Sequence, residues 1–163
     1  MHNVCEDFYA VQAAGRVPEH DVLVTNPPYS GTHVERLLRF ARENAKPFLL
    51  LLPDYFGRRP NYRPALGEEI EPLFLCPRDR YQYWTPEGLR DQANAKGHRN
   101  LALGQRNSPF VSYWHVHLGP RLPRAGLLRR SGEELGLVAD TRLFDSIDAV
   151  AEAGWGQRAR AER

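Results

Sequence analysis

Residues 48–52, Phe-Leu-Leu-Leu-Leu before Pro53, constrain the fold more than any other part of this sequence. Both alternate faces of the run are apolar, which is typical of a central parallel strand that helices cover on both sides. Residues 21–26 form a second apolar, β-branched run that stops at Asn26, where two prolines follow. The chain is therefore expected to build a layered structure around at least one fully buried strand.

A helix is expected between these two strands. Residues 32–35, Thr-His-Val-Glu, fit a capping box, in which the threonine and glutamate side chains bind backbone N–H groups of the first turn. Asn44 and Pro47 would end the helix. Strand, helix and strand in this order predict a right-handed crossover between parallel strands. The apolar residues spaced on one helical face are Val34, Leu37, Leu38 and Ala41.

Two further strands and a second helix are expected later in the chain. Residues 73–76 predict a weak strand and residues 110–118 a stronger one. In the latter, His115 and His117 would lie opposite a face formed by Trp114, Val116 and Leu118. Two histidines could bind a metal, but without a third ligand they are interpreted as ordinary strand residues. The second helix is expected near Phe144, Ile147, Val150 and Ala151, followed by an arginine-rich, disordered tail.

Length and composition indicate one soluble globular domain. A chain of 163 residues with 42% hydrophobic content can bury a real core, and 10% aromatic content is untypical of disorder. No apolar run could span a bilayer, and the N-terminus lacks the pattern of a secretory signal, so an intracellular protein, cytoplasmic or nuclear, is expected. Cys5 and Cys76 make no zinc spacing, and no metal is predicted.

Arginine and aromatic residues are concentrated in two segments. All but Lys46 and Lys96 of the 22 basic residues are arginines, which suit phosphate and base edges but also reflect codon bias in a GC-rich genome. Residues 78–107 lack periodicity, as functional or disordered loops do. Together with residues 55–63 they mix planar rings with guanidinium groups, which can stack bases and hold phosphates. A solvated arginine-rich loop with aromatics against the core explains the pattern equally well.

Asn26-Pro27-Pro28-Tyr29 follows the first strand and precedes the helix. In this context the tetrapeptide resembles the catalytic motif of class I S-adenosylmethionine-dependent amino-methyltransferases, especially the adenine-N6 DNA methyltransferases. The resemblance implies that Asn26 and the Pro27 carbonyl accept hydrogen bonds from the target amine and stabilise its developing positive charge. The prolines stiffen the turn and remove two backbone donors. It also implies that Tyr29 stacks on the target ring after extrusion from a duplex. An Asn-Pro turn without chemistry is the alternative.

Two further matches extend this resemblance over residues 7 to 118. Asp7-Phe8 is similar to the family's Asp-Phe pair, in which the acid binds the adenine amine of the cofactor and the ring lies against it. An aromatic residue near the last strand helps clamp the flipped base in the family, which implies this role for Phe110. The fold implied is α/β: a partial Rossmann-like methyltransferase fold, its mostly parallel sheet flanked by helices and including a C-terminal antiparallel strand. Residues 1–120 would form the catalytic region, and 121–163 a helical extension and tail.

The family's first strand and glycine-rich cofactor turn have no counterpart in the sequence. The one Gly-x-Gly, at Gly154 and Gly156, has no preceding strand pattern. Either the chain is a piece of a longer protein, completed by a missing N-terminal segment or a partner chain, or it has lost cofactor binding. The expected substrate is DNA, with RNA or protein as alternatives. A catalytically inactive nucleic-acid or protein-binding module and a protein glutamine N-methyltransferase therefore both remain open, and no membrane partner is expected.

Overall fold

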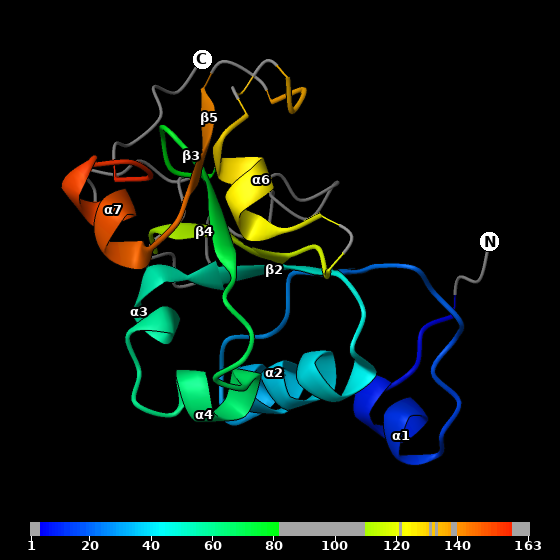
Figure 1. Cartoon of the computed structure of the whole chain (residues 1–163). Coiled ribbons are helices and arrows are strands. Elements are labelled where there is room, and N and C mark those ends of the chain that lie inside the picture. Colours follow the sequence, from blue (N-terminus) through cyan, green and yellow to red (C-terminus); the bar gives the residue numbers. More distant parts are fainter. Residues whose placement is uncertain are drawn as a thin grey trace.

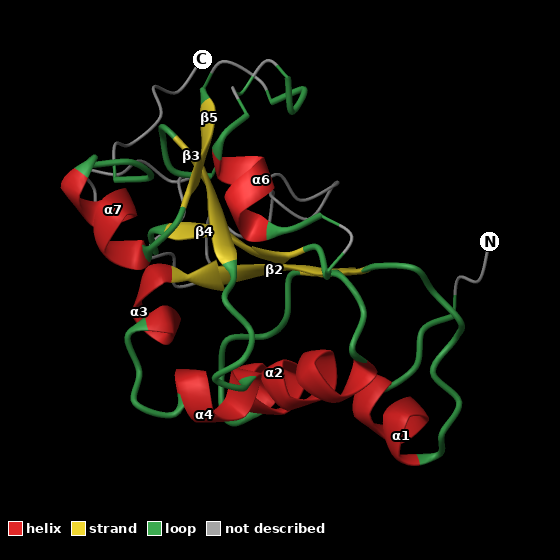
Figure 2. Cartoon of the chain, viewed as in Figure 1, coloured by secondary structure: helices red, strands yellow, loops and turns green. Residues whose placement is uncertain are grey.

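The computed structural model describes residues 4–81, 110–120, 122–130, 132, 134–137 and 140–157. Within them, a five-stranded mixed sheet is flanked by helices, which confirms the α/β class (Figures 1 and 2). The strands are β1 (Leu23–Thr25), β2 (Phe48–Pro53), β3 (Leu73–Pro77), β4 (Ser112–His117) and β5 (Thr141–Phe144). The helices are α1 (Phe8–Ala13), α2 (His33–Asn44), α3 (Asp54–Gly57), α4 (Tyr62–Leu66), α6 (Arg124–Leu128) and α7 (Ile147–Glu152).

The expectation of a mostly parallel sheet is wrong. The strand order is β1-β2-β4-β3-β5, and only β1 and β2 pair in parallel. The pairs β2–β4, β3–β4 and β3–β5 are antiparallel. β2 and β3 do run in the same direction, but β4 lies between them and runs the opposite way. A buried apolar run reveals that a strand is covered, but not which strand lies beside it.

Helices cover the two faces of this sheet unequally. On one face, Phe48, Leu50 and Leu52 of β2 pack in a core with α2 and α4. On the other face, Leu73 and Val116 pack against Leu127 of α6. Figure 1 shows α2 and α4 on the opposite side of β2 from α6. β2 is therefore buried on both sides, as its sequence predicted.

Helix α2 carries the expected apolar face but not the expected cap. Val34, Leu37, Leu38 and Ala41 are all buried. Thr32 occupies the N-cap position without a side-chain capping bond, so the predicted capping box is wrong. Glu35 instead accepts hydrogen bonds from Arg39 and from Asn61. Partners outside the first turn have drawn this carboxylate away from the backbone.

The C-terminal part contains a strand that the sequence pattern did not reveal. Phe144, expected in a helix, ends β5, which pairs with β3. The helix begins at Ile147, where the Ser146 hydroxyl accepts a hydrogen bond from the Ala149 N–H at 3.1 Å. The expected arginine-rich tail beyond residue 157 and most of the expected loop at residues 78–107 lie outside the described residues. Within the described residues, every helix is too short or too polar to cross a lipid bilayer.

Candidate active site at the end of strand β1

The Asn26-Pro27-Pro28-Tyr29 turn leaves the sheet where β1 ends at Thr25. Asn26 and Pro28 are exposed, Tyr29 is half-buried and Pro27 is buried. Because neither proline has an N–H group, residues 27 and 28 offer backbone carbonyl oxygens and no backbone donors. The turn therefore presents acceptors at the surface, beside the end of the parallel strand pair.

The Tyr29 hydroxyl orients the Asn26 side chain. It lies 2.6 Å from Asn26 Oδ1 and 3.3 Å from the backbone oxygen of Leu51. A hydroxyl has one proton, and the shorter distance favours donation to Asn26. An amide oxygen has two lone pairs, so Asn26 Oδ1 keeps one for a further donor. The Asn26 side chain is thus held in place, and its oxygen can accept one more hydrogen bond.

A pocket of about 320 Å³ opens beside this turn. It brings together three of the four predicted catalytic residues, Asn26, Pro27 and Pro28, with the two predicted cofactor-binding residues from a separate part of the chain. Its volume is at the low end of the range for small-molecule sites, roughly 300–1,000 Å³. Tyr29 and Phe110 do not line it. The lining residues are Asp7, Phe8, Tyr9, Leu23, Thr25, Asn26, Pro27, Pro28, His33 and Leu37.

Asp7 has a structural role as well as a place in the pocket. Its Oδ1 atom caps α1 by accepting hydrogen bonds from the backbone N–H groups of Tyr9 at 2.8 Å and Ala10 at 3.2 Å. Its Oδ2 atom has no hydrogen-bond partner in the part of the chain that is described. Phe8 packs edge-to-face on Phe40, with ring centroids 5.0 Å apart. The capping bonds thus fix the carboxylate and leave one oxygen available to a ligand.

Tyr9 and His33 line the same pocket but were not predicted as site residues. The Tyr9 hydroxyl donates to the backbone oxygen of His33 at 2.7 Å, and the Arg36 guanidinium lies 3.6 Å from the centre of the Tyr9 ring. Burial raises the pKa of Tyr9, and the Arg36 charge partly opposes this shift. The sequence patterns assign neither residue a role in a site, and only the approach of α1 to the start of α2 reveals one.

Phe110 contacts Tyr29 outside the pocket. It is 41% exposed, and its ring contacts Tyr29 edge-to-face at 6.3 Å and Tyr55 at 5.7 Å. The structure therefore brings the two predicted substrate-contacting aromatics together. Their position next to Asn26 suits contacts with a planar group.

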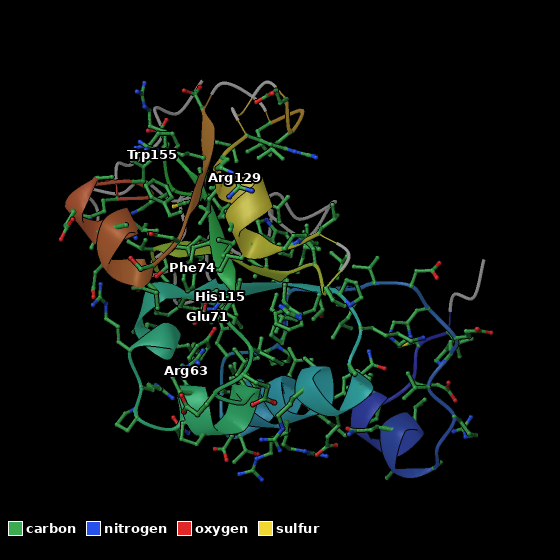
Figure 3. The ribbon with its side chains drawn as sticks, in the orientation of Figure 1. Arg63, Glu71, Phe74, His115, Arg129 and Trp155 are labelled. Atoms are coloured by element: carbon green, nitrogen blue, oxygen red, sulfur yellow. The ribbon has the colours of Figure 1, made fainter. Side chains whose placement is uncertain are left out.

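His115 is a core residue. It is fully buried, its Nδ1 atom lies 2.6 Å from the Tyr62 hydroxyl, and its ring stacks on Tyr113 at 5.4 Å. Figure 3 shows His115 close to Phe74, whose ring centroid is 5.0 Å away. No group of three or more candidate metal ligands occurs among the described residues. Both His115 and His117 lie in β4, as predicted.

The burial of His115 predicts a pH-dependent stability. Burial lowers its pKa from 6.5 to about 3. The unfolded chain takes up this proton below pH 6.5, so the contribution of the neutral ring is complete above that pH and is lost as pH falls toward 3. Between pH 6.5 and about 5, the free energy of unfolding should fall by roughly 1.5 kcal/mol more in the wild type than in His115→Phe. Urea denaturation at both pH values measures the difference, and equal falls would contradict the prediction.

Comparisons of the chain with protein-family models, with curated proteins and with solved structures find no match.

Proposed function

We propose that this chain is an S-adenosylmethionine-dependent N-methyltransferase-like protein that acts on the exocyclic amine of adenine in DNA. The observation that carries the proposal is the Asn26 side chain, exposed at a strand end and lining a pocket shared with Asp7 and Phe8. Its amide oxygen is oriented by Tyr29 and keeps a free lone pair. An acceptor held in this way suits an amine that must be activated.

The chemistry assigned to this turn is the stabilisation of positive charge on nitrogen. The lone pair of an adenine amine is delocalised into the ring, which makes the nitrogen a weak nucleophile. Hydrogen bonds from the amine to Asn26 Oδ1 and to the Pro27 carbonyl would favour a pyramidal nitrogen whose lone pair is available. Because both acceptors are fixed before the reaction, they act by electrostatic preorganisation. Tyr29 and Phe110 would contact the target ring.

The pocket beside the turn would receive the adenosine part of the cofactor. The Oδ2 atom of Asp7 can accept a hydrogen bond from an adenine amine, and Phe8 supplies an apolar ring beside it. The cofactor would supply an electrophilic methyl group. The described residues include no glycine-rich turn after a strand, since Gly154 and Gly156 follow helix α7. The proposal therefore includes a further segment or partner chain that holds the methionine part.

The proposal is tested with the purified chain. It should bind S-adenosylmethionine in a calorimetric titration and transfer labelled methyl to an adenine-containing oligonucleotide, but not to an oligonucleotide without adenine. A glutamine-containing peptide added as a competitor distinguishes the protein-amide alternative, because only a true substrate becomes labelled. Absence of both cofactor binding and transfer, even after upstream coding sequence is added, would overturn the proposal.

A non-catalytic nucleic-acid-binding module is the second candidate. It is favoured by the absence of a glycine-rich cofactor turn from the described residues. DNA binding that depends on salt but is unchanged by Asn26→Ala, with no binding of S-adenosylmethionine, would favour this candidate.

A further inference from the structure

The arginine- and aromatic-rich segment at residues 55–63 divides into residues that hold the fold and one that does not. Phe56 and Tyr62 are buried in the main core. Arg58 forms an ion pair with Asp148 at 2.8 Å. Arg63 donates to the backbone oxygens of Ile70 and Glu68 and pairs with the Glu68 carboxylate; Figure 3 shows it on α4. These four residues already have structural partners.

Arg59 is arranged differently. Its side chain is exposed, and its guanidinium carbon lies 4.4 Å from the ring centre of Phe56 and 5.1 Å from that of Tyr55. It forms no ion pair with a carboxylate of the described residues. Stacking of a guanidinium on aromatic faces leaves its N–H groups, at the edge of the plane, free to bind an anion. Arg59 is therefore an oriented cation whose charge has no counterion within the described part of the protein.

Glu35 is an acidic residue near Arg59. Glu35 lines a small hollow together with Arg59 and Gly31. However, Glu35 is already held by Arg39 and by Asn61, whose Nδ2 atom is 3.0 Å away. The hollow also includes Gly31 from the loop that follows Tyr29, so Arg59 lies beside the candidate catalytic loop.

A continuous series of contacts joins Arg59 to Asn26. The ring of Tyr55, below the Arg59 guanidinium, contacts Phe110 at 5.7 Å, and Phe110 contacts Tyr29 at 6.3 Å. The Tyr29 hydroxyl then reaches Asn26. Phe110, which lies between the cation and the amide in this series, is 41% exposed. A cation followed by planar rings matches the alternation of phosphate and base along a nucleic-acid strand.

We propose that Arg59 binds a backbone phosphate of a single-stranded nucleic acid whose bases contact Tyr55 and Phe110. This inference rests on the proposed function, because it names the substrate class and the direction from which the strand reaches Asn26. A single strand is favoured over a duplex because aromatic rings can contact only bases that are unstacked. An acidic peptide could pair with the Arg59 guanidinium, but it has no base that could contact the rings of Tyr55 and Phe110.

The test compares two neighbouring arginines, Arg59→Gln and Arg58→Gln, in binding to a labelled single-stranded oligonucleotide. Fluorescence anisotropy is measured over a series of salt concentrations without cofactor. Loss of one phosphate contact should weaken binding by Arg59→Gln roughly tenfold. It should also reduce the slope of log affinity against log salt by about 0.7. Arg58→Gln should stay within about twofold of the wild type, because Arg58 is neutralised by Asp148. Circular dichroism checks that both variants are folded.

The variant Phe110→Leu tests the contribution of the Phe110 ring to binding separately from that of the Arg59 charge. It should weaken binding by about fivefold or more, as expected for loss of base stacking, and leave the salt slope unchanged. Equal effects of Arg59→Gln and Arg58→Gln, or an unchanged slope in Arg59→Gln, would overturn the inference. So would a wild-type chain that does not bind the oligonucleotide, or one that binds a glutamate-rich peptide of equal charge just as tightly.

These outcomes also separate the inference from the proposed function. Arg59-dependent binding of DNA without any binding of S-adenosylmethionine, even after upstream coding sequence is added, would support the nucleic-acid-binding surface and contradict the methyltransferase proposal. Conversely, methyl transfer to adenine by a protein whose DNA affinity is unchanged by Arg59→Gln would support the proposed reaction. It would overturn the proposed nucleic-acid-binding surface.

Discussion

Replacement of Asn26 with alanine is expected to lower the rate of methyl transfer to adenine by about 10²- to 10³-fold. The change removes the side-chain oxygen that Tyr29 orients and that would accept the amine N–H. A preorganised acceptor of this kind acts mainly in the transition state, so kcat should fall much more than the affinity for substrate. Single-turnover transfer of labelled methyl, alongside oligonucleotide binding, measures the two effects separately.

Tyr29→Phe is the matched control for this prediction. It keeps the aromatic ring and removes only the hydroxyl that lies 2.6 Å from Asn26 Oδ1. The amide then loses an orienting contact but keeps its oxygen, so the rate should fall by no more than about tenfold, the effect of one ordinary hydrogen bond. If Asn26→Ala retained most of the transfer activity, the assigned role of the turn would be wrong. The same conclusion would follow if Tyr29→Phe were as damaging as Asn26→Ala.

Replacement of Leu50 with alanine should cause the largest loss of stability among the changes considered, about 2–5 kcal/mol. Leu50 is fully buried in β2, between Thr25 of β1 and His115 of β4. The truncation leaves a cavity in a core that strands on both sides and a helix layer hold at fixed spacing. For a chain of this size the midpoint of thermal unfolding should drop by about 4–20 °C. Thermal and urea denaturation followed by circular dichroism measure the change.

Leu49→Ala provides the comparison on the opposite face of the same strand. Leu49 is half-buried and packs at the edge of the smaller core beneath α6. Because less apolar surface is lost from water there, its destabilisation should be clearly smaller than that of Leu50→Ala. Equal losses at the two positions would mean that the α2–α4 core does not dominate the stability of the sheet.

The sequence by itself determined the elements that carry strong local patterns. β2 was evident because burial on both faces requires an unbroken apolar run, and the inner face of α2 because Val34, Leu37 and Leu38 repeat at helical spacing. The Asn26 turn was evident because two prolines leave few conformations to the chain. For each of these features the physical cause lies in residues close together in the sequence, so the sequence alone reveals it.

Tertiary structure alone decided the features that depend on residues far apart in the chain. The insertion of β4 between β2 and β3 made two of the four strand pairs antiparallel, and β5 is stable as a strand because β3 pairs with it. Asn61 lies near Glu35 only because α4 packs on α2, and Tyr9 reaches His33 only because α1 meets the start of α2. Such contacts depend on which surfaces meet after the chain has folded. The spacing of residues within one segment does not determine which surfaces these are.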